Sequence, residues 1–82
     1  MITLLYFARY REVLGLDSEQ LVFAKPCTVQ DVIEQLKQRG EPWSSTLSDS
    51  KLMLAVNQTI ASAEQELNDG DELAFFPPVT GG

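Results

Sequence analysis

The feature that most limits the folds open to this 82-residue chain is a single clear amphipathic helix. Its apolar residues recur three or four positions apart and so share one side of the helix: Val29, Val32, Ile33 and Leu36. Thr28 is a good N-cap residue, and Asp31 three positions later resembles a weakened capping box. Gly40 can end the helix after the basic side chains of Lys37 and Arg39. One helix of this kind must bury its apolar stripe against a sheet.

The other segments predict a mixed sheet of four to five strands. Residues 2–8 are apolar on both faces, which suits a central strand covered on both sides. Further strands are predicted at residues 19–24, 52–56, 59–61 and 72–76. The second strand is expected to pair with the first, because the segment between them is short.

The connections between these strands are predicted to be short or irregular. Residues 9–14 can form a short helical turn that Gly15 ends. Residues 41–51 are polar and are interpreted as a loop. Within it, Trp43 and Leu47 are expected to fold back onto the core, and a binding role for Trp43 is the less favoured alternative.

One main helix on one face of a mixed sheet is an α+β domain, and the order of elements is that of a β-grasp (ubiquitin-like) fold. The first and last strands are the most apolar, so they are expected to lie side by side in the centre of the sheet. That arrangement is expected to bring the two ends of the chain close together. Residues 1–76 are assigned to the domain, and residues 77–82 to a protruding, flexible C-terminal tail.

The charge of the chain argues against nucleic acid as a partner. The net charge is −6, whereas nucleic-acid binding relies on Lys and Arg. No Lys or Arg follows Lys51, while five acidic residues do. The end that carries the tail is therefore expected to be acidic and to attract a basic partner, unless the charge serves only solubility.

The composition also argues against several kinds of site. There is no histidine, and Cys27 is the only cysteine, so no metal site is predicted. Cys27 is interpreted as a small, partly buried filler rather than as a reactive thiol near a helix start. No apolar stretch approaches the roughly 20 residues of a membrane span, and no signal peptide is recognised, so a cytoplasmic protein without membrane contact is expected.

The C-terminal tail carries the strongest indication of function. Gly81 and Gly82 leave an ionised carboxylate on a thin stalk that can enter a channel too narrow for other residues. Pro77 and Pro78 stop the last strand and stiffen the base of the tail, which can reach roughly 20 Å. The alternative is a frayed end without function. The apolar strand directly before the prolines instead favours a tail that projects from a fixed point.

Three runs of the sequence resemble the small subunit of molybdopterin synthase, a family of ubiquitin-like sulfur carriers. They are residues 4–12, residues 54–58 and residues 67–82. The last run, LNDGDELAFFPPVTGG, is the most specific of the three, whereas a Gly-Gly end alone would be a weak indication.

This resemblance implies a mechanism and a set of partners. An E1-like adenylating enzyme would use ATP to adenylate the carboxylate of Gly82, and a sulfur donor would convert the adenylate to a thiocarboxylate. The tail, with Gly81 and Gly82 as its catalytic residues, would enter the large subunit of molybdopterin synthase within a heterotetramer. There it would transfer sulfur to cyclic pyranopterin monophosphate to form the molybdopterin dithiolene. No stably bound cofactor is expected.

A partner-binding surface is expected at the base of the tail. The resemblance implies that the exposed sheet face meets both partners, and its contact residues are predicted to be Phe7, Ile60, Phe76, Pro77, Pro78, Val79 and Thr80. Because side chains alternate along a strand, Phe75 and Phe76 must point to opposite faces. Phe76 is assigned outward, and a register error of one residue would exchange the two.

Three alternatives remain open from the sequence. A sulfur carrier of thiamine synthesis or another sulfur pathway would share the fold and the glycine end, but it usually lacks the Phe-Phe-Pro-Pro-Val approach. A ubiquitin-type protein modifier usually has a basic residue before the glycines, where Thr80 stands here. A plain interaction domain with accidental terminal glycines is the third alternative.

Overall fold

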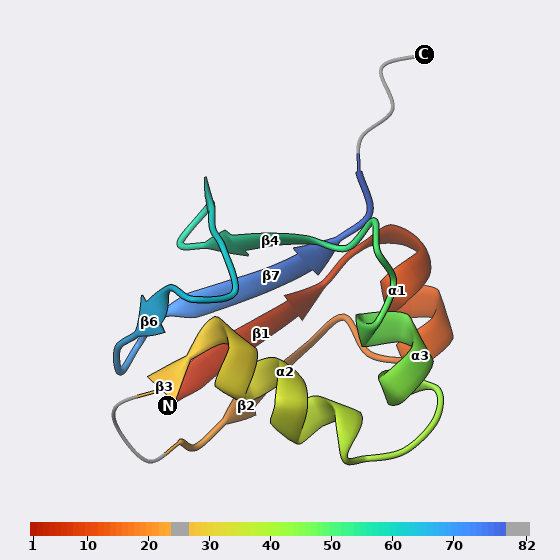
Figure 1. The fold of residues 1–82 in the computed structure, drawn as a ribbon, viewed down its shortest axis with the longest axis horizontal. Helices are drawn as coiled ribbons and strands as arrows, with labels where there is room; N and C mark the ends of the chain where they lie inside the picture. The colour runs from red at the N-terminus through yellow and green to blue at the C-terminus, as the bar shows by residue number, and fades with distance from the viewer. Residues whose placement is uncertain (24–26, 79–82) are drawn as a thin grey trace.

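The computed structural model describes residues 1–23 and 27–78 as one layer of helices on one face of a mixed sheet (Figure 1). Its elements are β1 (Ile2–Tyr6), α1 (Ala8–Leu14), β2 (Ser18–Leu21), β3 (Cys27–Thr28), α2 (Val29–Lys37), α3 (Trp43–Leu47), β4 (Met53–Val56), β5 (Thr59–Ile60), β6 (Glu66–Leu67) and β7 (Glu72–Phe76). The main sheet has the order β2-β1-β7-β4-β5, and β3 and β6 form a separate pair. The predicted α+β class, mixed sheet and β-grasp arrangement are confirmed.

The core lies between α2 and the inner face of the main sheet. The predicted stripe of α2 is almost completely buried: Val29, Val32 and Leu36 are 0% exposed and Ile33 is 5% exposed. The capping box of α2 is complete, because the Asp31 N–H donates to Thr28 Oγ1 at 3.2 Å and the Thr28 N–H donates to Asp31 Oδ2 at 2.8 Å. Cys27, just before this cap, is buried, more fully than the partial burial that the sequence suggested.

Several predicted boundaries were wrong. The segment predicted as a loop contains α3, which is only five residues long and rich in Ser and Thr. The first strand ends at Tyr6 rather than Ala8, because Ala8 takes a positive φ of 53° and begins α1. The pair β3 and β6 was missed, since two-residue strands are too short to show alternation.

The prediction that the first strand is covered on both sides was also wrong. Ile2, Leu4 and Tyr6 are buried, whereas the alternate residues Thr3 and Leu5 are only partly buried. All helices pack on one face of the sheet, so the apolar residues on the other face are not part of the core (Figure 1).

The direction of the central strands overturns two further expectations. β1 and β7 are parallel, so Met1 and Phe76 lie at opposite ends of the sheet, and the start of the chain is not brought close to the end of the last strand. The acidic segment before β7 lies at the Met1 end, where the amino group of Met1 forms an ion pair with Asp69. β7 then runs about 13 Å from Glu72 to Phe76. The acidic residues are therefore not beside the point where the chain leaves the sheet, as the sequence had suggested.

Candidate functional site

The outer face of the sheet carries an apolar groove, here called the outer groove. It has a volume of about 410 Å³ and is lined by Leu5, Phe7, Ala55, Gln58, Ile60, Glu72, Ala74 and Phe76. Along β7 the residues Leu73 and Phe75 are fully buried toward the helices, so Phe76 points outward, as predicted. The groove thus runs along β7 from Glu72 to Phe76, and its Phe76 end lies where the C-terminal segment begins.

Strand register explains the shape of the outer groove. Ala74 is paired with Leu5 of β1 on one side and with Ala55 of β4 on the other, and Ala55 is paired with Ile60 of β5. Two small residues therefore form the floor, and larger apolar residues form the walls. Ile60 is 62% exposed, although an isoleucine would normally be buried.

The structure brings together the predicted contact residues Phe7, Ile60 and Phe76, and Phe7 is 44% exposed. Pro77 is partly buried and Pro78 is exposed directly after β7. The predicted residues Val79, Thr80, Gly81 and Gly82 lie outside the described residues. The chemistry predicted for Gly82 therefore remains a prediction.

Five lining residues were missed by the sequence reasoning: Leu5, Ala55, Gln58, Glu72 and Ala74. Alternation along the first, third and last predicted strands could have identified all of them except Gln58, which lies in the turn between β4 and β5. Leu5 was missed because the first strand was assumed to be covered on both faces.

The aromatic ring of Phe75 fixes the end of β7 from the core side. It stacks on Tyr6 with a centroid distance of 5.5 Å and an interplanar angle of 11°, and Trp43 meets Tyr6 edge-on at 5.6 Å. The Tyr6 hydroxyl donates to Glu19 Oε2 at 2.8 Å. Burial, followed by this hydrogen bond, raises the pKa of Tyr6 far above its ordinary value, so the hydroxyl stays protonated.

Arg39 completes this cluster from the C-terminal end of α2. Its guanidinium makes two hydrogen bonds to Glu19, each of 2.9 Å, and lies 4.4 Å from the centre of the Trp43 ring. The hydrogen bonds from Arg39 lower the pKa of Glu19 below its ordinary value. Trp43 thus packs against the core, as predicted, and this cluster holds α2 and α3 near the end of β7.

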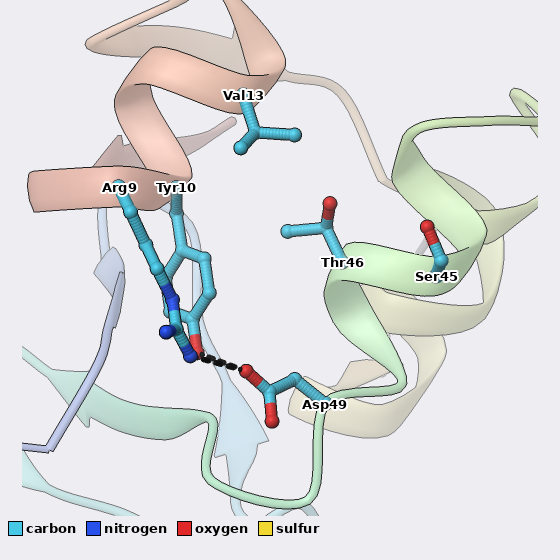
Figure 2. Close-up of a pocket in the computed structure, with 6 residues that line it drawn as sticks. All are labelled: Arg9, Tyr10, Val13, Ser45, Thr46 and Asp49. Carbon is cyan, nitrogen blue, oxygen red and sulfur yellow. Dashed lines mark hydrogen bonds and ion pairs between the residues drawn. The ribbon is translucent and has the colours of Figure 1, made fainter.

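A second hollow, of about 310 Å³, lies between α1 and α3 (Figure 2). The Arg9 guanidinium donates to Asp49 Oδ2 at 2.7 Å, and the Tyr10 hydroxyl donates to the same oxygen at 3.1 Å. Hydrogen bonds, first from the Lys51 backbone N–H and then from Tyr10 and Arg9, lower the pKa of Asp49. These hydrogen bonds link the segment after α3 to α1. Because Arg9, Tyr10 and Asp49 are already paired with one another, they are not placed to bind a ligand in the hollow.

Two further findings concern only residues 1–23 and 27–78. No group of three or more Cys, Asp or Glu side chains in this part of the chain is placed to hold a metal ion. No helix within it is long and apolar enough to cross a membrane.

The fold and the outer groove define a ubiquitin-like domain with an apolar surface beside its C-terminal segment. A sequence profile of the ThiS family matches residues 4–82, and the chain belongs to this family. It is similar over its full length, and over the full length of each relative, to the "Molybdopterin synthase sulfur carrier subunit" of Haemophilus influenzae, with 46% identity, and of Escherichia coli K12, with 45% identity.

Solved structures show the same fold. A molybdopterin converting factor subunit from Pyrococcus furiosus superposes with a TM-score of 0.82 at 34% identity, covering 95% of this chain and 97% of the other. Crystalline SAMP1 from Haloferax volcanii gives 0.81 at 27% identity, covering 99% and 98%. The BexX/CysO complex of Amycolatopsis orientalis contains a chain that gives 0.70 at 26% identity with full coverage of both chains.

Proposed function

We propose that this chain is the sulfur carrier subunit of a molybdopterin synthase. The observation that carries the proposal is the identity of 45–46%, over full length, to two proteins of that name. The outer groove supports it, because a carrier without catalytic side chains of its own must dock on the proteins that act on its tail. The chain would therefore act as the non-autonomous, sulfur-donating small subunit of the synthase.

The chemistry is proposed to take place at Gly82. Its carboxylate attacks the α-phosphorus of ATP on an E1-like adenylating enzyme, and pyrophosphate leaves. Sulfide (HS⁻) supplied by a sulfur donor then attacks the acyl carbon and expels AMP, which gives the thiocarboxylate and releases a proton. Adenylation is needed because it turns a poor leaving group into a good one. ATP is thus a co-substrate of the activating enzyme rather than a bound cofactor of this chain, and the reaction is proposed to take place in the cytoplasm.

Sulfur delivery is proposed to occur inside the large subunit of the synthase. The tail carries the thiocarboxylate into that active site, where two successive transfers to cyclic pyranopterin monophosphate build the dithiolene. Tethering gives the sulfur a high effective concentration at the acceptor. Gly81 and Gly82 provide a stalk without side chains, and residues 77–80 span the distance from the end of β7.

Docking is proposed to use Phe7, Ile60 and Phe76. These side chains lie on the outer groove beside the start of the tail, so a partner that covers the groove also receives the tail. The complex that contains the Amycolatopsis relative supports this class of assembly, because a similar domain is seen there with a partner. A heterotetramer of two small and two large subunits is proposed.

Other sulfur pathways and protein modification are the alternatives. The likeness to SAMP1 of Haloferax volcanii, a small archaeal modifier protein, supports protein modification as an alternative. The two classes differ in their products, because a carrier ends as a thiocarboxylate and a modifier ends as an amide to another protein.

The test is to incubate the chain with the activating enzyme, ATP and a sulfur donor and to measure its intact mass. Exchange of one oxygen for sulfur, lost again on addition of the large subunit and the pterin substrate, supports the proposal. Conjugates to other proteins would overturn it. A chain extended by one residue beyond Gly82 is the matched control and should stay unmodified and inactive, because a displacement of about 1 Å can cost about 100-fold in rate.

A further inference from the structure

We propose that the partner seated on the outer groove supplies two chemically distinct side chains, a bulky apolar one above Ala55 and Ala74 and a cationic one beside Glu72. This inference rests on the proposed function, and it specifies what the large subunit must present to this chain. It assigns a binding role to three residues for which the sequence indicated none.

The apolar side chain is inferred from the floor of the groove, which Ala55 and Ala74 form. Ala55 and Ala74 face outward on neighbouring strands, yet they are only 7% and 9% exposed. They are covered by the larger side chains on either side, Leu5 from β1 and Ile60 from β5. A partner side chain placed between these walls would contact apolar atoms on both flanks and displace water from the floor. Such a desolvated recess is where interface anchors contribute most to affinity.

The cationic side chain is inferred from Glu72. Among the residues that the structure describes, it is the only ionisable side chain that lines the outer groove, and it is partly buried. Its backbone is tied to Asn57, whose side-chain Oδ1 accepts from the Glu72 N–H at 3.0 Å and whose N–H donates to the Glu72 carbonyl at 2.8 Å. The Glu72 carboxylate itself has no hydrogen bond or ion pair among the described residues. It is therefore free to receive a partner group.

Covering the groove would remove water from this carboxylate. An unpaired buried charge is strongly unfavourable, so a partner that covers Glu72 must bring a Lys or Arg to it. Glu72 is two residues from Ala74 on the same face, so the cation must lie about 7 Å along the strand from the apolar anchor. A second copy of this chain fits poorly, because it would bring a second Glu72 and another net charge of −6.

The experiment measures the affinity of the complete chain for the large subunit by isothermal titration calorimetry at several salt concentrations. Glu72→Gln should weaken binding about tenfold at low salt, with the difference from wild type shrinking as salt rises. The matched control is Glu66→Gln on β6, which removes the same charge at an exposed position outside the groove and should leave the affinity unchanged. Ala74→Leu fills the floor and should weaken binding at least about tenfold at every salt concentration.

The outcomes separate this inference from the proposed function. If wild type binds and receives sulfur but Glu72→Gln matches it at all salt concentrations, the cationic contact is wrong. If Ala74→Leu binds as wild type does, the apolar anchor is wrong, and circular dichroism confirms that this variant is folded. If wild type neither binds the large subunit nor gains sulfur, the proposed function itself fails, and this inference fails with it.

Discussion

Phe75 and Phe76 are neighbours in the sequence, but truncating them should damage two different properties. Phe75 is 0% exposed and stacks on Tyr6, so Phe75→Ala leaves a cavity in the core. A truncation of this kind costs about 3–5 kcal/mol of the free energy of unfolding. For a domain of this size each kcal/mol corresponds to about 4–8 °C, so the unfolding temperature should fall by more than about 10 °C.

Phe76→Ala should have the opposite profile. Phe76 lies on the outer groove and is only partly buried, so its loss should cost about 1 kcal/mol of stability. At an interface, an aromatic anchor of this kind contributes about 2 kcal/mol or more, which is about 30-fold in the dissociation constant. Binding to the large subunit should therefore weaken strongly while the protein remains folded.

The assay pairs thermal unfolding, followed by circular dichroism, with titration calorimetry against the large subunit. Calorimetry is run well below the unfolding temperature of Phe75→Ala, so that the folded fraction of both variants is the same. Two results would refute the reasoning. The first is that Phe76→Ala binds the large subunit with unchanged affinity. The second is that Phe76→Ala unfolds while Phe75→Ala keeps the unfolding temperature of wild type, which would mean that Phe76 is the core residue and Phe75 the outward one.

Three further predictions concern the helix cap, an ion pair and the tail. Thr28→Ala removes the acceptor of the Asp31 N–H, so urea denaturation should show a loss of about 1 kcal/mol, and no loss would contradict the role of the cap. Arg39 lowers the pKa of Glu19 in the folded protein. The ion pair between them therefore stabilises the fold above about pH 4.5, and this stabilisation is lost as the pH falls through the lowered pKa of Glu19. Glu19→Gln should therefore make the unfolding temperature less sensitive to acid than that of wild type, and parallel pH profiles would disprove this. Gly81→Ala should slow adenylation or sulfur delivery, because a channel fitted to glycine would clash with Cβ, and unchanged rates in both half-reactions would argue for a roomy channel.

The parts of the fold that follow local periodicity could be predicted from the sequence. The apolar residues of α2 recur with the 3.6-residue period of a helix, and a capping box marks where this helix begins. The outward position of Phe76 follows from the two-residue period of a strand, once the register is chosen. These patterns depend on neighbouring residues only. The short helix α3 did not show such a pattern, because it is a single turn that packing stabilises, with Trp43 held between Tyr6 and Arg39.

The position of the charges could not be predicted in the same way. Asp71 and Glu72 are close to the tail along the chain, yet the parallel pairing of β1 and β7 places them near Met1 and away from Phe76. Sequence distance is a poor guide here because a strand of five residues carries the chain across the whole sheet. The groove residue Glu72 was missed for the same reason, since its surroundings are set by partner strands rather than by its neighbours in the sequence.

The one-sided sheet connects this architecture to the proposed role. A two-layer domain gains stability by burying one sheet face, and nothing in the core requires apolar residues on the other. Phe7 and Ile60 nevertheless stand exposed there, next to the point where the chain leaves β7. Phe75, clamped on Tyr6 from the opposite face, fixes that point relative to the outer groove. A protein that covers the groove therefore receives the start of the tail in a defined place, which is what the transfer of a group from the chain end requires.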